Sequence, residues 1–231
     1  MFKFRKNLRT VAKIIAFLVV TTMFATCDKK NGDEDDNGGT ASNAGVMING
    51  VKWATCNVDA PGKFAAKPEA PGMFYQWDRK VAWATTGNIT GWDVSPPPTD
   101  AEWSKANDPS PAGWRVPTHD DIQTLLDLVK VSNEWTTVNG VGGRKFIDNA
   151  SGNSIFLPAV GYRHVNDGAL EGVDDESGGL GGFYWSSSRS TNSGASRLGF
   201  GSGSTDDNNG AGWTLYHVGY GLSVRPVAEK L

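Results

Sequence analysis

The sequence predicts an α+β fold of small twisted antiparallel sheets, with one or two helices and a long loop-rich region. Three observations indicate this class. One stretch has a strong helical period, several short stretches have strand composition, and turn-forming residues separate them. The 231-residue chain also contains 29 glycines, nine tryptophans and ten phenylalanines. A few large aromatic side chains are therefore expected to hold many loops in place.

Residues 1–26 have the features of a lipoprotein signal peptide. Five basic residues precede an apolar run at 14–25, which is too short to span a bilayer but suits the hydrophobic part of a signal peptide. Small residues followed by Cys27 match a bacterial lipobox, so we expect cleavage before Cys27 and acylation of its thiol. The alternative is an ordinary signal peptide with an incidental cysteine. The predicted location is the outer membrane, with a lipid anchor and exposure at the cell surface.

Residues 27–45 are expected to form an acidic, disordered tether after the lipidated cysteine, because they contain few apolar residues that could pack. Removal of residues 1–26 takes five of the 22 basic residues and none of the 25 acidic ones, which leaves a net charge of −8. A chain with this charge and no basic cluster is a poor nucleic-acid binder. Membrane contact is expected through the lipid anchor only.

Residues 46–231 have the length of a single domain, long enough to bury a core. With Cys27 acylated, Cys56 is the one free thiol that remains in the mature chain. The sequence therefore predicts no intrachain disulfide. Cys56 is interpreted as a small buried hydrophobic residue. A reactive thiol is the alternative.

The clearest helix signal begins at Thr118, a typical N-cap that Asp120 and Asp121 follow in the first turn. Four apolar residues then recur at the spacing of one buried helical face: Ile122, Leu125, Leu126 and Val129. A weaker helix is predicted at residues 99–105.

Turn residues at 149–153 predict a hairpin between strands at 144–148 and 154–157, and a second turn is predicted at 166–168. Further strands are predicted at 184–187, 197–200, 213–218 and 222–227. Residues 170–182 are acidic and glycine-rich and are predicted to form a long loop.

Six segments carry a resemblance to a known family. They are residues 49–58 (NGVKWATCNV), 71–77 (PGMFYQW), 107–118 (NDPSPAGWRVPT), 156–163 (FLPAVGYR), 182–187 (GFYWSS) and 223–227 (SVRPV). In this order the chain resembles the Fibrobacter succinogenes major paralogous domain, a family of exported Bacteroidetes proteins. The 109–118 stretch is the most specific part.

The resemblance implies a C-type-lectin-like fold related to the formylglycine-generating sulfatase-modifying enzymes. It implies that residues 46–53 lie beside residues 222–227 as neighbouring strands. The family often has cysteines where this chain has Ser110 and Pro226, so one disulfide is expected to be lost and the fold to be independent of oxidation. The acidic tether is similar to the export signal of surface lipoproteins.

Neither catalysis nor a cofactor is expected. The formylglycine-generating relatives use a cysteine pair on copper, which this chain does not supply. The histidines at 119, 164 and 217 lack metal-site spacing, and His119 is expected to be exposed. Residues 174–176 and 206–209 are rich in carboxylate and amide oxygens without the spacing of a known calcium loop. We interpret them as solvated acidic loops, with calcium ligation as the alternative.

Two loops, at 186–196 and 201–212, are predicted to form a binding surface. Small polar residues mixed with aromatic residues and arginine are typical of adaptable recognition loops. The candidate ligand-binding residues are Arg189, Asn192, Arg197, Asp206, Asn208, Trp213, Tyr216, His217 and Tyr220. The expected ligand is a glycan or another cell-surface protein. The alternative is a structural or fimbria-associated envelope component with a fixed protein partner.

Overall fold

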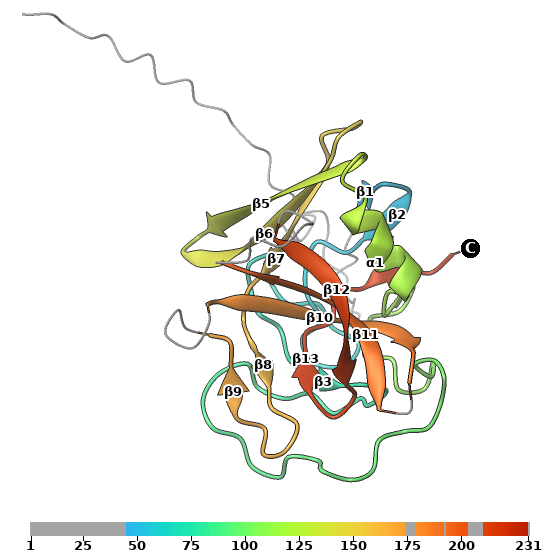
Figure 1. Ribbon diagram of the computed structural model, residues 1–231, viewed down its shortest axis with the longest axis vertical. Coiled ribbons are helices and arrows are strands. Elements are labelled where there is room, and N and C mark those ends of the chain that lie inside the picture. Colours follow the sequence, from blue (N-terminus) through green and yellow to red (C-terminus); the bar gives the residue numbers. More distant parts are fainter. Residues whose placement is uncertain (1–44, 174–178, 192, 203–209, 231) are drawn as a thin grey trace, which may run out of the picture.

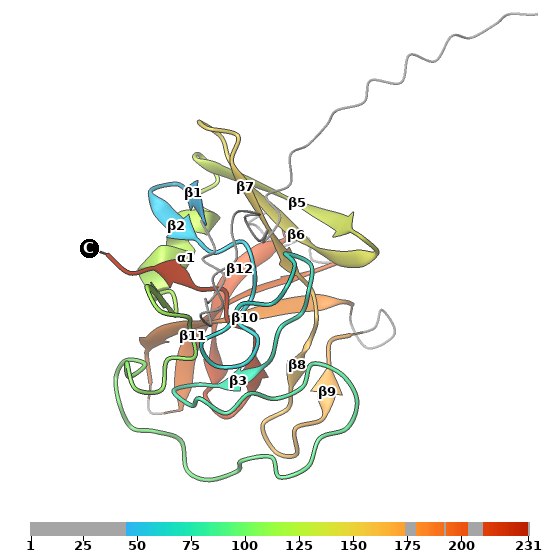
Figure 2. The same ribbon diagram turned by 180° about the vertical axis from the view of Figure 1, so that it is seen from behind.

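Four small antiparallel sheets and one short helix make up the computed structural model, which describes residues 45–173, 179–191, 193–202 and 210–230 (Figure 1). The expected mixture of small antiparallel sheets with a helix is therefore present, and strands predominate. Between β3 and β4 the chain follows a long irregular path around one end of the molecule (Figures 1 and 2).

The first sheet joins the two ends of the described chain. Its strands, in spatial order, are β1 (Val46–Ile48), β2 (Val51–Trp53), β14 (Val227–Ala228) and β4 (Trp114–Arg115). Val227 pairs with Trp53, and the amide of Ala54 donates to the carbonyl of Pro226 at 2.9 Å. The expected pairing of the terminal segments is confirmed. The prediction of one continuous strand at 222–227 is wrong, because this segment is divided between β13 (Gly221–Leu222) and β14.

A second sheet contains a hairpin that we predicted and one that we did not. Its strands are β5 (Val131–Val138), β6 (Val141–Asp148) and β7 (Ser154–Pro158). The β6–β7 hairpin confirms the turn at 149–153. Between β5 and β6, Asn139 and Gly140 both have positive φ, 49° and 85°, as a two-residue hairpin turn requires. This Asn-Gly signal was present in the sequence but was not interpreted as a turn.

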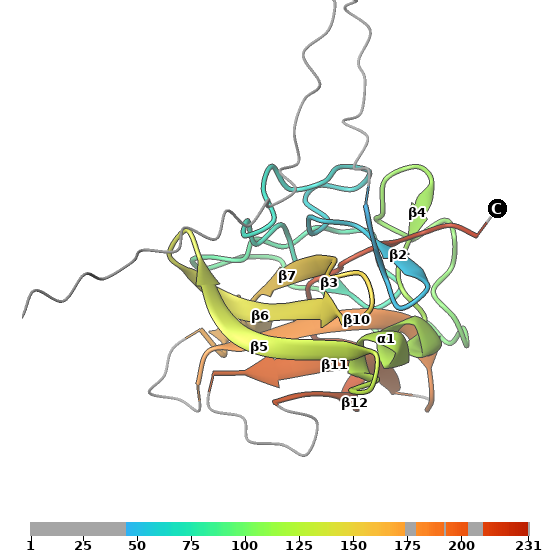
Figure 3. The same cartoon turned by 90° about the horizontal axis from the view of Figure 1, so that it is seen from above.

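The sheet that carries the candidate site consists of β10 (Gly181–Arg189), β11 (Gly194–Gly201) and β12 (Ala211–His217). The β5–β7 sheet lies over one of its faces, with α1 beside it (Figure 3). The predicted loop at 186–196 is wrong in part, since β10 continues to Arg189. Trp103 donates its amide to the carbonyl of Ser187 at 3.0 Å, and the Ser187 amide donates to Pro117 at 2.7 Å. These contacts with distant segments keep residues 186–189 extended.

The fourth sheet has the order β3 (Tyr75–Gln76), β13 (Gly221–Leu222), β8 (Tyr162–Arg163) and β9 (Leu170–Glu171). The predicted turn at 166–168 lies between β8 and β9, which pair with each other. The loop predicted at 170–182 is therefore wrong at both ends, which belong to β9 and β10. The Arg163 side chain is buried and donates to the carbonyls of Ala84, Thr86, Gly87 and Gly168.

The helix α1 (His119–Leu126) begins as predicted. Thr118 and Asp121 form a reciprocal capping box, and Ile122, Leu125 and Leu126 are buried. Val129 was expected on the same face, but it is 87% exposed. The helix ends at Leu126, and the Asp127 carboxylate accepts a hydrogen bond from the Val129 amide, which turns the chain toward β5.

No helix forms at residues 99–105, so this prediction is wrong. Glu102 instead makes an isolated β-bridge with Ser188 of β10. Trp103 is buried, with its ring 5.8 Å from that of Trp77. Pairing with β10 and burial of an aromatic ring outweigh a weak local helix preference.

Cys56 is buried and disulfide-bonded. The burial agrees with our interpretation, but the prediction of a chain without a disulfide is wrong. The other cysteine of the sequence, Cys27, lies outside the described residues. The expected independence of the fold from oxidation is therefore also not supported.

Candidate ligand-binding site

Consecutive aromatic residues of β10 point to opposite faces of the β10–β12 sheet. Tyr184 lies in one core with Leu198 and Phe200, against α1 and the β5–β7 sheet. Trp185 lies in the other core and donates its indole N–H to the carbonyl of Tyr75 at 2.8 Å. Phe183 shares the face of Trp185 because side chains alternate along a strand. The side chains from the middle of β10 are buried in the two cores, whereas Phe183 lies near one end of the sheet.

Glycines form the floor of a trough at this end of the sheet. In the strand register Gly181 is opposite Gly201, Phe183 is opposite Gly199, and Gly199 is opposite Gly212. Directly paired residues share a face, so four glycines from three strands lie on the face of Phe183. A cavity of about 280 Å³ lies here. Its lining residues are Gly179, Gly181, Phe183, Arg197, Gly199, Phe200, Gly201, Gly212, Trp213 and Thr214. We call this cavity the glycine trough.

The Arg197 side chain lies in the glycine trough. Its guanidinium carbon is 4.6 Å from the ring centre of Phe183 and 4.4 Å from that of Tyr216. The two rings are nearly parallel, with centres 6.5 Å apart. Burial lowers the pKa of Arg197 to about 10, so the group keeps its positive charge at neutral pH. Cation–π contacts with two rings therefore hold a charged group in a fixed position.

Two further aromatic rings, those of Tyr162 and Tyr220, pack against the rings that contact Arg197. The Tyr162 ring centre lies 5.0 Å from that of Phe183 and 5.8 Å from that of Tyr216, and Tyr220 lies 4.2 Å from Tyr216. The Tyr162 hydroxyl donates to the Glu171 carboxylate at 2.7 Å. Burial, together with this carboxylate, raises the pKa of Tyr162. Packing of four rings against one another leaves little freedom to the rings that contact Arg197.

The predicted site residues are divided between several places. Arg197 lines the glycine trough and contacts the ring of Tyr216, against which Tyr220 packs. Trp213 and His217 lie on β12 at positions that alternate with Tyr216, and so point to the opposite face. Three predicted residues lie outside the described part of the chain: Asn192, Asp206 and Asn208.

Arg189 is not among the residues that line the glycine trough. It lies at the end of β10, donates to the carbonyls of Pro98, Asp100 and Thr191, and has its guanidinium 5.5 Å from the Trp77 ring. The prediction that Arg189 lies in a loop is wrong, since it is the last residue of β10 and these contacts hold it against the 98–100 segment.

Phe183, Tyr162, Gly199 and Thr214 were missed as site residues. The alternation of glycine with larger residues in GASRLGFG of β11 was a usable signal, because every second residue of a strand shares a face. The position of Tyr162 had no such signal, since it depends on the packing of β8 against β10.

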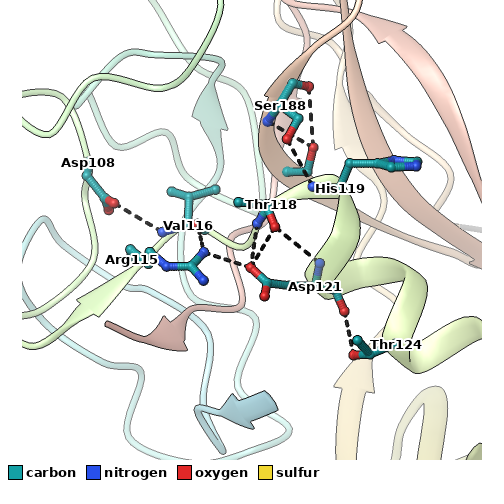
Figure 4. Close-up of polar contacts among 9 residues, drawn as sticks. Asp108, Arg115, Val116, Thr118, His119, Asp121, Thr124 and Ser188 are labelled. Atoms are coloured by element: carbon teal, nitrogen blue, oxygen red, sulfur yellow. Dashed lines mark hydrogen bonds and ion pairs between the residues drawn. The ribbon is translucent and has the colours of Figure 1, made fainter. Parts of the chain in front are cut away.

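The start of α1 forms a polar network with β4 and β10 (Figure 4). The Asp121 carboxylate accepts hydrogen bonds from Arg115 at 2.7 Å and from the Thr118 amide at 2.8 Å. Burial alone would raise the pKa of Asp121, but these hydrogen bonds outweigh it and hold the pKa below its usual value. The Ser188 hydroxyl accepts from the His119 amide at 3.0 Å. This network attaches the helix to the sheet.

His119 was expected to be exposed, but it is partly buried. Its ring lies edge-on against Trp213 with centres 4.5 Å apart, and its Nδ1 is 2.7 Å from Ser196 Oγ. The side-chain amide of Gln123 lies against the other ring nitrogen, with its Nε2 3.2 Å from His119 Nε2. Ser196 is buried, so a substrate in solution does not reach its hydroxyl. This pair is therefore a structural contact.

Within the described ranges, no group of three or more His, Cys, Asp or Glu side chains is placed to hold a metal ion. The two oxygen-rich segments, 174–176 and 206–209, lie outside those ranges. A second cavity of about 270 Å³ borders the β5–β7 sheet. There Glu134 and Lys145 are directly opposite each other, so their charges compensate.

Comparisons of the chain with models of known protein families, with curated proteins and with solved structures found no match. In the described part of the chain, no helix is long and apolar enough to cross a membrane.

Proposed function

We propose that this protein is a cell-surface binding domain without catalytic activity, which holds a glycan in the glycine trough. The observation that carries the proposal is the combination of a glycine floor, the Phe183 ring and a charged guanidinium in one cavity, with the Tyr216 ring holding the guanidinium from outside the lining. Small-molecule sites are concave and are lined mainly by apolar and aromatic side chains with a few placed polar groups. The resemblance to the Fibrobacter succinogenes major paralogous domain, with its C-type-lectin-like fold, supports the same class.

We further propose that the exported chain carries a lipid anchor at Cys27 in the outer membrane, which would replace the disulfide of Cys56 because the sequence contains two cysteines. Acylation forms a thioether and consumes the thiol, so an acylated Cys27 cannot take part in a disulfide. Intact-mass measurement of the protein from the outer-membrane fraction should show cleavage before Cys27 and an added acyl mass. A mature chain without acyl groups, whose cysteines are blocked to alkylation until reduced, would contradict the anchor.

The first test is a glycan array probed with the full chain, with calcium and with chelator. The full chain is used because Cys56 is disulfide-bonded, and a fragment that starts after the tether would lack the second cysteine. We expect a glycan signal that chelator leaves unchanged. A signal abolished by chelator would assign the recognition to a metal site instead.

Thr214→Trp should abolish the glycan signal. Thr214 is exposed and lines the trough, so an indole there fills the cavity without disturbing a core. Leu215→Trp is the matched control, since Leu215 is the next residue, is 40% exposed and points to the opposite face. We expect at least about a tenfold loss of affinity for the first variant and less than about a twofold change for the second. Equal behaviour of the two variants would exclude the trough as the binding site.

The alternative is a structural or fimbria-associated envelope component with a fixed protein partner. A specific observation favours it: β12 is an edge strand, and it exposes Trp213 and Leu215 by 47% and 40%. Exposed large apolar side chains on an edge strand suit contact with another protein. If one envelope protein co-purifies with the chain, Leu215→Asp releases it, and the array stays silent, this alternative takes first place.

A further inference from the structure

Arg197 is the one arginine of the described chain that donates no hydrogen bond. Seven arginines lie in the described residues, and six of them donate to carbonyl, carboxylate or amide oxygens: Arg79, Arg115, Arg144, Arg163, Arg189 and Arg225. The Nε of Arg197 is buried without an acceptor, and no described carboxylate forms an ion pair with its guanidinium. A buried donor without an acceptor destabilises a fold.

We propose that Arg197 binds the anionic group, a carboxylate or a sulfate, of an acidic glycan that lies in the glycine trough. This inference rests on the proposed function and specifies its ligand class. Guanidinium groups form paired hydrogen bonds with carboxylate and sulfate-like oxygens. The carboxylate or sulfate of the ligand would therefore supply the hydrogen-bond acceptors that the described residues do not offer to Arg197.

The surroundings of Arg197 fix where that anion lies. A Cβ at position 199 would be 1.9 Å from the Nη1 of Arg197, so the guanidinium extends over Gly199 along the floor of the trough. The guanidinium lies over the rings of Phe183 and Tyr216. Its Nε is enclosed, so the terminal Nη groups are the donors that an anion in the cavity would meet.

The size of the cavity favours a sugar over an acidic peptide. Its volume of about 280 Å³ lies just below the usual range of small-molecule pockets, roughly 300–1,000 Å³. One acidic sugar ring with its carboxylate fits such a space. An extended peptide needs a groove that continues past several residues, and among the described residues the lining of this cavity is confined to one end of a three-stranded sheet.

The test measures binding of the full chain to three sets of probes. The first set contains oligosaccharides that end in glucuronate or N-acetylneuraminate, the second contains the same sugars with the carboxyl reduced to an alcohol, and the third contains sulfated neutral sugars. Free acetate and inorganic sulfate serve as competitors. We expect binding of acidic sugars, at least about tenfold weaker binding after carboxyl reduction, and no competition by the small anions at millimolar concentration.

Two variants test the role of Arg197 itself. Arg197→Met should weaken binding of the acidic probes by about 10- to 100-fold, the effect of a lost hydrogen bond to a charged group. Its melting temperature should stay the same or rise, because the unsatisfied buried donor is removed. Gly199→Ala keeps the charge but displaces the flexible end of Arg197, and should weaken the same probes at an unchanged melting temperature. Lys130→Met, which removes an exposed charge beside α1, is the matched control.

The outcomes separate this inference from the proposed function. Equal binding of acidic and carboxyl-reduced sugars, unaffected by Arg197→Met, would overturn the inference and leave the glycan-binding domain standing. Full competition by acetate or sulfate alone would also overturn it, as a sign of nonspecific anion binding. Absence of any glycan signal would overturn the proposed function. A lowered melting temperature of Arg197→Met would show that the arginine serves the fold instead.

Discussion

Trp185→Ala should lower the free energy of unfolding by about 3–5 kcal/mol, the usual cost of removing a large aromatic side chain from a core. Trp185 is completely buried in the core that it shares with Trp77 and Leu222. Its indole N–H also satisfies the carbonyl of Tyr75, which would lose its donor. Since small domains are stable by only about 5–15 kcal/mol, this variant should be close to unfolding. Urea denaturation followed by circular dichroism measures the change.

Trp213→Ala is the matched control for this prediction. Trp213 lies on the same sheet but is 47% exposed, with an edge contact to His119. We expect a loss below about 1 kcal/mol, as for most surface substitutions. If Trp185→Ala does not accumulate as a folded protein, Trp185→Phe should show a smaller loss in the same direction. Equal losses for Trp185→Ala and Trp213→Ala would contradict the assignment of Trp185 to the core.

Arg225→Met should lower the free energy of unfolding by about 3 kcal/mol or more, because it leaves several buried acceptors without a donor. Arg225 is fully buried, and burial lowers its pKa to about 10. Its guanidinium donates to Asn57 Oδ1 at 2.9 Å and to the carbonyl of Phe156 at 3.0 Å. It also donates to the carbonyls of Ala54 and Pro68. One side chain thus connects three segments that are far apart in the sequence.

Two further variants make this prediction specific. Arg225→Lys keeps the charge but lacks the planar fork, so it should also destabilise the protein substantially. Lys105→Met removes a lysine whose side chain is 76% exposed and pairs with Glu229 at the surface, and we expect a loss of no more than about 1 kcal/mol. Chemical denaturation at neutral pH compares the three. A lysine variant as stable as the natural protein would show that charge, and not the placement of donors, matters at this position.

Local signals decided the elements that were predicted correctly. The start of α1 follows from Thr118 and Asp121, because a capping box is made within four consecutive residues. The β6–β7 hairpin and the β8–β9 turn likewise depend on residues that are close in sequence. The Asn139-Gly140 turn was equally local and was predictable, although it was overlooked.

The candidate site was predicted only in part, because its members come from distant segments. Arg197 and Tyr216 were selected by residue type, and the structure brings them together. Trp213 and His217 were selected by the same criterion and lie on the opposite face, because side chains alternate along the strand that was predicted at 213–218 and residue type alone ignores this alternation. The composition of residues 181–217 therefore indicated a binding region but not which side chains share a surface.

The sequence by itself determined the signal-peptide pattern, the charge, the capped helix and the short-range hairpins of this protein, because each depends on neighbouring residues. Tertiary structure alone decided the extended path of residues 99–105, the continuation of β10 from Ser187 to Arg189, and the setting of Arg197. In each of these cases the hydrogen bonds or ring contacts come from segments far away in the chain. Local preference there is weak, and the burial of aromatic rings against distant partners determines the conformation.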